Sequence, residues 1–161
     1  MKKKCKDCPF NTDKVMSHEV EPASFKDAVD RRQELKAAAG AGYQAFVKFL
    51  INEEGWDAKA LAENTLLDES MYEKITGEAP MEEMPVRGTA MSLCIGLRLE
   101  PSVSRMLFEA AGLGFSNSRE HCAHEVILDG YCGRGVAWCS RLLVQAEFRK
   151  LERAKWAKGK K

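Results

Sequence analysis

The residues best suited to chemistry in this chain are its cysteines and histidines. Cys5 and Cys8 form a C-x-x-C pair, and so short a loop lets two thiolates point at one zinc ion. One pair is only half of a zinc site. The other half could come from His18, or from the run HCAH at 121–124, if the fold brings them near. The alternative is that both cysteines are free thiols on an arm, because a lone C-x-x-C has low specificity.

Catalysis has little support in the remaining residues. His121 and His124 lie three residues apart and would share a helix face, but no H-E-x-x-H or equivalent carboxylate pattern accompanies them. The GLGF run at 112–115 lacks the preceding strand that a phosphate-binding loop needs. We therefore expect no enzyme, and no cofactor beyond the conditional zinc.

Composition limits the class of protein. The chain has 161 residues and a formal net charge of +1, enough for one domain with a real core. No apolar run is long enough to cross a membrane, and no apolar signal-peptide core follows the first residues. We expect a cytoplasmic protein that makes no membrane contact. In that compartment its six cysteines are thiols or metal ligands rather than disulfides, and Cys94 belongs to the core.

Residues 56–77 predict two short helices joined by a tight turn. Asp57 can cap the first helix, and Trp56 and Leu61 have the spacing of a hydrophobic staple. Asp68 repeats this pattern at the start of the second helix. The two helices would share a buried face made of Leu61, Ala62, Leu67, Tyr72 and Ile75. This pattern is typical of a helix-turn-helix.

The flanking sequence predicts an all-α fold in four parts. Residues 1–23 are a basic, Cys-containing arm, and 24–42 are a leading helix with Ser24 as its cap. Residues 43–112 form the helix-turn-helix core, with further helices at 43–54, 86–99 and 101–111. Residues 113–161 are a helical extension with a basic tail.

The last helix is expected to run without a break from after Gly135 to about Ala157. Apolar residues line its first half and become sparse after Ala146. The far end would then project or meet a partner chain, which allows a homodimer.

Two runs of residues carry a resemblance to a known family: TLLDESMYEKITGEAP at 65–80 and AMSLCIGLRLEPSVSRMLFEAAGLGFS at 90–116. Their order resembles the helix-turn-helix domains of the phage-repressor and Cro-like (xenobiotic-response-element) superfamily. More narrowly, it resembles a Firmicutes-type variant in which an apolar CIGL helix precedes a proline and an AG helix end. The similarity covers roughly residues 43–143. It implies a five-helix DNA-binding core, usually in a transcriptional regulator and often dimeric.

In that family the second helix of the motif enters the major groove of DNA. DNA-binding faces favour basic and amide side chains, whereas residues 57–83 hold eight acids and two lysines, a balance of −6. The positions of this chain that match the exposed recognition face are Glu69, Ser70, Met71, Glu73, Lys74 and Thr76.

Both ends of the chain are basic. Residues 141–161 hold eight basic residues against two acids, a balance of +6, and the first fourteen residues of the N-terminal arm hold five lysines against two acids, a balance of +3. Such ends commonly contact phosphates, although they can equally serve solubility alone. The candidate tail contacts are Arg149, Lys150, Arg153 and Lys155.

Two functions follow from these patterns. The first is a DNA-binding protein in transcriptional control, with double-stranded DNA as its partner. The alternative is a protein-binding module, such as an anti-defence or antitoxin-like inhibitor. Its acidic face would engage the basic, nucleic-acid-binding surface of a target protein.

Overall fold

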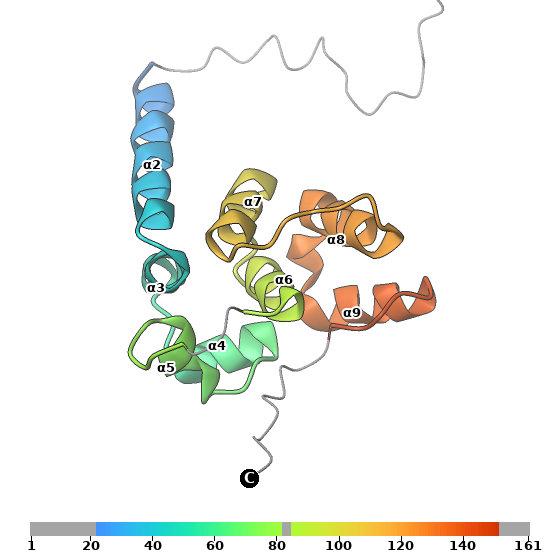
Figure 1. Cartoon of the computed structure of the whole chain (residues 1–161). Coiled ribbons are helices and arrows are strands. Elements are labelled where there is room, and N and C mark those ends of the chain that lie inside the picture. Colours follow the sequence, from blue (N-terminus) through green and yellow to red (C-terminus); the bar gives the residue numbers. More distant parts are fainter. Residues whose placement is uncertain (1–21, 82–84, 152–161) are drawn as a thin grey trace, which may run out of the picture. The chain divides into compact units, whose positions relative to one another are not determined.

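The computed structural model describes residues 22–81 and 85–151, and every regular element within these ranges is a helix (Figure 1). The all-α prediction is therefore confirmed. None of the helices in these ranges is both long and apolar enough to cross a bilayer. The chain divides into two units between Glu34 and Leu35, within helix α2 (Pro22–Gly40).

Helix α2 begins at Pro22, so Ser24 lies inside the helix and the prediction that Ser24 caps it is wrong. Proline suits the first turn of a helix because the N–H it lacks would have no partner there. Leu35 is the first residue of the second unit, and it is buried in the hydrophobic core.

Helix α3 (Tyr43–Glu54) matches its prediction at both ends. It stops at Gly55, whose φ of 66° is left-handed and therefore favours glycine. The apolar residues recur at helical spacing, so one side of the helix turns to the core. These buried residues are Tyr43, Phe46, Val47, Leu50 and Ile51.

Helices α4 (Ala58–Thr65) and α5 (Met71–Ile75) occupy the predicted motif. The Asp57 carboxylate accepts the Ala60 N–H at 2.8 Å, which confirms the predicted cap. Helix α4 ends where Leu66 takes a left-handed φ of 58°. The prediction that Asp68 starts the second helix is wrong. Its carboxylate accepts the Ser70 N–H at 2.9 Å within a turn, and α5 begins at Met71.

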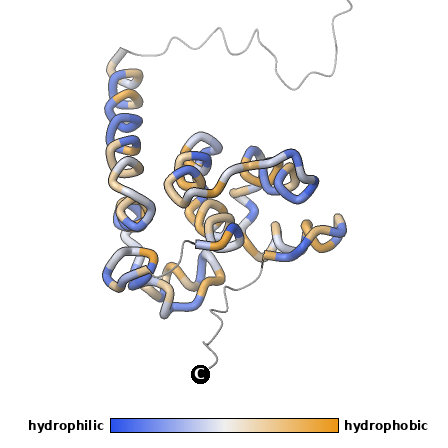
Figure 2. Tube along the Cα trace, in the orientation of Figure 1, coloured by the Kyte–Doolittle hydropathy of each residue, from blue (hydrophilic) through white to orange (hydrophobic). Residues whose placement is uncertain are grey.

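Helix α6 (Arg87–Gly96) is the centre of the second unit and packs on α4, α7, α8 and α9. It is among the most hydrophobic stretches of the tube in Figure 2. Seven consecutive residues, Thr89 to Ile95, are buried, which explains the low charge of this segment. Helix α7 (Pro101–Ala110) follows with proline at its first position and closes at Gly112, whose φ is 68°.

Three further elements complete the unit: α8 (Arg119–Gly130), the short 3₁₀ helix η1 (Cys132–Arg134) and α9 (Val136–Gln145). The prediction of one long final helix to about Ala157 is wrong. Glu147 takes a left-handed φ of 63°, and the Phe148 N–H donates to the Leu143 carbonyl at 2.8 Å. This pattern ends a helix.

Phe148 and Leu151 then pack on the core of the same chain. The Leu151 N–H donates to the Ser140 hydroxyl at 3.2 Å. Phe148 and Leu151, which were expected to project or meet a partner chain, therefore pack within their own unit, and the apolar residues beyond them lie outside the described residues.

Candidate functional site

The surface of the second unit from the end of α3 through α5 is acidic. We call this surface the α4–α5 face. Residues 53–78 hold eight acids and two lysines, a balance of −6, and every one of the eight carboxylates is exposed. They are Glu53, Glu54, Asp57, Glu63, Asp68, Glu69, Glu73 and Glu78.

The structure exposes only some of the predicted recognition residues. Glu69, Ser70 and Glu73 are exposed, and Lys74 is half-buried. The prediction that the other two lie on an exposed face is wrong: Met71 and Thr76 are buried, at 4% and 3% exposure.

Packing explains both departures. Met71 begins α5 and points into the core that α3 and α4 share with it. The Thr76 hydroxyl donates to the Tyr72 carbonyl at 2.7 Å, so this buried polar group has its partner within the protein. A five-residue helix is only about 7.5 Å long, so it has few outward positions.

The two lysines offset little of the negative charge of this face. Lys59 approaches Glu63 at 3.9 Å, and both side chains are strongly exposed. Exposed pairs of this kind contribute little to stability because solvent screens them. With eight carboxylates against two lysines, the α4–α5 face keeps a formal net charge of −6.

Gln44 of α3 holds the far end of α5. Its side-chain amide donates to the Lys74 carbonyl at 2.6 Å and to the Ala79 carbonyl at 3.3 Å. These are carbonyls that the end of a short helix would otherwise leave to water. Gln44 thus fixes α5 and the loop after it against α3.

The turn between α4 and α5 is held from the other side by α6. Thr65 donates its hydroxyl to the Leu61 carbonyl at 2.7 Å and accepts the Leu67 N–H at 3.2 Å. Gly96 meets this turn closely: a Cβ placed there would lie 2.7 Å from the Thr65 methyl group and 2.8 Å from the Asn64 carbonyl oxygen. Only glycine leaves room for this contact.

The zinc hypothesis gains no support from the described residues. Cys5, Cys8 and His18 lie outside them, and no group of three or more metal-ligating side chains gathers within them. In the run at 121–124, the His121 Nδ1 accepts the Ser116 N–H at 2.8 Å. Its neighbour Cys122 is exposed.

The buried cysteines are poor nucleophiles. Cys94 is fully buried, as predicted for a core residue, and burial raises the pKa of its thiol far above the ordinary value. Burial also raises the pKa of Cys132 to about 11 and that of Cys139 in the same direction. A thiol attacks as its thiolate, so these groups stay unreactive near neutral pH.

The half-buried Arg87 of α6 and the buried His124 of α8 influence each other. Arg87 lies over the rings of Phe108 and Phe115, at 5.3 and 5.0 Å, and donates to the Gly114 carbonyl. Burial lowers its pKa, while Glu120 and Glu125 oppose that shift. His124 is 5% exposed, and its pKa is lowered first by burial and then by the charge of Arg87.

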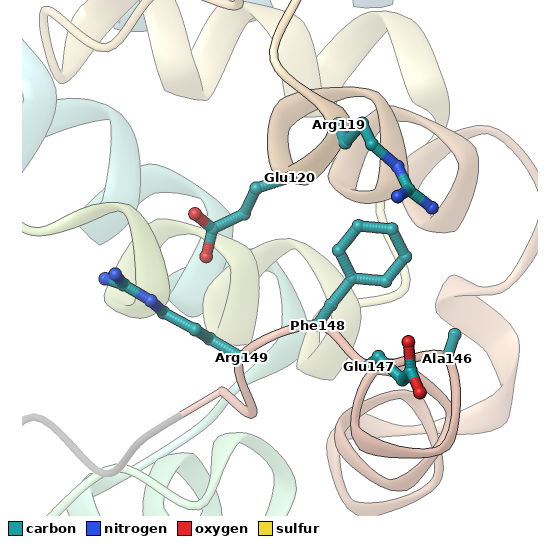
Figure 3. A pocket seen from close by; sticks show the side chains of 6 residues that line it. All are labelled: Arg119, Glu120, Ala146, Glu147, Phe148 and Arg149. Carbon is teal, nitrogen blue, oxygen red and sulfur yellow. The ribbon is translucent and has the colours of Figure 1, made fainter.

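Two of the four predicted tail contacts are described, and both are exposed: Arg149 and Lys150. Arg153 and Lys155 lie outside the described residues. Arg149 lines a pocket of about 310 Å³ between the start of α8 and the turn after α9 (Figure 3). The other lining residues are Arg119, Glu120, Ala146, Glu147 and Phe148.

Sequence reasoning missed Gln44, Arg87 and this pocket. All three depend on contacts between segments far apart in the chain, and no local pattern marks them. Gly96 did carry a signal, because a glycine inside an apolar helix often marks a close approach.

The described chain is thus an all-helical protein with a short two-helix unit held between α3 and α6. Comparison of the chain with protein-family models, with curated proteins and with solved structures gave no match.

Proposed function

We propose that the protein binds double-stranded DNA through a helix-turn-helix and acts in transcriptional control. The observation that carries this proposal is the construction of the α4–α5 unit. A capped helix, a left-handed turn at Leu66 and a second short helix follow one another, and Gln44 and Gly96 hold them from two sides. Two packed helices, the second preceded by the exposed residues Glu69 and Ser70 and carrying the exposed Glu73, suit a major groove.

In this proposal Ser70, which is exposed, and Lys74, which is half-buried, read the bases, since Met71 and Thr76 are buried. A serine hydroxyl can bond to several base edges, and lysine favours guanine. The carboxylates beside them can only accept hydrogen bonds, from the amino groups of cytosine and adenine, and phosphates repel them. Affinity must then come largely from cations elsewhere.

Arg149 and Lys150 are exposed and supply cations outside the α4–α5 face. Each phosphate that such a residue neutralises releases a counterion, which makes binding favourable and sensitive to salt. In this proposal the basic residues provide affinity and α5 provides selection.

Substitutions on α5 test the division of roles. Replacing Ser70 and Lys74 with alanine should weaken binding to a selected DNA site by about tenfold, since base contacts are lost. Glu73→Gln should leave binding intact or improve it, because it removes a repulsive charge. Fluorescence anisotropy on the selected duplex and on random duplex measures both effects. Equal binding by all three proteins would contradict a reading role for α5.

A second candidate is the protein-binding module, favoured by the eight exposed carboxylates of the α4–α5 face. Its partner would carry a basic, nucleic-acid-binding surface, as in an anti-defence or antitoxin-like inhibitor. Complementary charge would give fast association and strong salt dependence. Under this candidate, reversing Glu69 and Glu73 to lysine abolishes the complex with the target and leaves the fold intact. Under the DNA proposal the same reversal strengthens binding to duplex DNA.

A further inference from the structure

The pocket between α8 and the turn after α9 brings four charged side chains together around one aromatic ring. It is lined by Arg119, Glu120, Glu147 and Arg149, with Phe148 among them (Figure 3). Among the described residues these four form no ion pair with one another within 4.0 Å. Two guanidinium groups and two carboxylates therefore line one pocket without forming ion pairs among themselves.

The charges are arranged in a definite way. Figure 3 shows the Glu120 carboxylate and the Arg149 guanidinium on the same side of the Phe148 ring, one from α8 and one from the segment after α9. Arg119 lies on the other side, with its guanidinium 5.7 Å from the centroid of that ring. Because the Glu120 carboxylate and the Arg149 guanidinium do not pair with each other, a ligand with one cationic and one anionic group can pair with both.

The backbone at the rim is fixed. Glu147 holds a left-handed φ of 63°, and the Phe148 N–H donates to the Leu143 carbonyl at 2.8 Å. Three residues after Phe148, the Leu151 N–H donates to the Ser140 hydroxyl. Side chains carried on an ordered turn lose less conformational entropy when they bind a ligand.

We propose that this pocket binds a zwitterionic α-amino acid with an apolar side chain. Its carboxylate pairs with Arg149, its ammonium group pairs with Glu120, and its side chain packs on Phe148. Charge-assisted hydrogen bonds of this kind are the strong ones, and one small molecule supplies both. The volume of about 310 Å³ is at the small end for ligand sites and suits a molecule of this size.

Ligands of one charge fit less well. A simple anion would meet the carboxylates of Glu120 and Glu147, and a simple cation would meet two guanidinium groups. The mixed lining therefore selects against both by repulsion. This inference goes beyond the proposed function and does not depend on DNA binding.

Titration calorimetry on the full-length chain tests the proposal. The ligands are the standard α-amino acids, with acetate, inorganic phosphate and methylamine as probes of one charge. We expect one or more apolar amino acids to bind and the probes of one charge not to bind. Arg149→Met and Glu120→Gln should each weaken binding by about tenfold or more, because a charged partner is lost.

Arg141→Met and Glu109→Gln are matched controls, since both residues are exposed and lie outside the pocket. They should bind as the parent protein does. Binding of acetate or phosphate as tight as that of any amino acid would overturn the proposal in favour of a plain anion site. Absence of amino-acid binding at millimolar concentrations would also overturn it, as would binding unchanged in both pocket variants.

Discussion

His124 lies buried on α8, where its Nδ1 has no hydrogen-bond partner among the described residues. Arg87 acts on it from α6, and the Arg87 Nη1 also lacks a partner there. His121 adds a further repulsive charge, and Glu120 is the one group that favours protonation. A proton on His124 would therefore place a buried cation beside the half-buried Arg87 guanidinium at the junction of α6 and α8.

This arrangement predicts that the protein loses stability in mild acid. The pKa of His124 is lower in the folded state than in the unfolded chain, so the unfolded state binds the proton more readily. The stability that neutral His124 contributes is complete above about pH 6.5, the ordinary pKa of histidine. It is lost as the pH falls through the lower pKa of His124 in the folded state. Urea midpoints measured from pH 5 to 7.5 should fall towards acid, and His124→Leu should flatten this dependence.

His18 and His121 remain in that variant and serve as an internal control. If His124→Leu loses as much stability in acid as the parent protein, the acid sensitivity arises elsewhere and our account of Arg87 and His124 is wrong.

Gly96 gives a second test that depends on a single residue. A methyl group added there would lie 2.7 Å from the Thr65 side chain and 2.8 Å from the Asn64 carbonyl oxygen. Gly96→Ala should lower the free energy of unfolding by about 1–3 kcal/mol, since α6 and the α4 turn must move apart. Gly130→Ala is the matched control: its Cβ would meet nothing within 4 Å, so we expect no loss. Equal effects of the two changes in urea titrations would argue against the close approach.

Among the elements, α5 depends most on a contact from outside itself. It has five residues, too few to be stable as an isolated helix. Gln44→Ala removes its side-chain bonds to the end of α5 and to the loop after it and should cost about 1–2 kcal/mol. Amide hydrogen exchange should quicken at Met71–Ile75 more than in α8. Gln145→Ala, at an exposed helix end, should change neither region, and uniform quickening throughout would contradict the account.

The elements also show what the sequence could predict. The five buried residues of α3 recur at helical spacing and α6 carries few charges, so the burial of both helices can be predicted from the sequence. In both helices the period of apolar residues directly reflects the side that faces the core. Glycine and proline likewise marked the ends of α3 and α7.

Three helix boundaries could not be predicted from the sequence, for a physical reason: the ends of α4 and α9 and the start of α5. Leu66 and Glu147 adopt left-handed conformations without being glycine, so no residue type marks the break. Met71 and Thr76 match an outward helical face by spacing, yet tertiary packing buries them. The sequence could therefore indicate the segment that carries the candidate site. It could not separate the exposed residues of that segment from the buried ones.

For the whole molecule, the separation of charge matters most. The described residues place an acidic α4–α5 face and the exposed cations Arg149 and Lys150 in the same unit. Because the net charge is only +1, the molecule as a whole neither attracts nor repels DNA strongly. Local placement of the cations then decides whether DNA binds.

The most direct test of the DNA-binding proposal is the affinity of the full-length protein for random duplex DNA across a salt series, measured by fluorescence anisotropy. The proposal predicts measurable binding at low salt and a linear fall of log affinity with log salt concentration. The slope should correspond to several neutralised phosphates. Absence of binding even at low salt would contradict the proposal, since the acidic face would then dominate and the partner would be a protein.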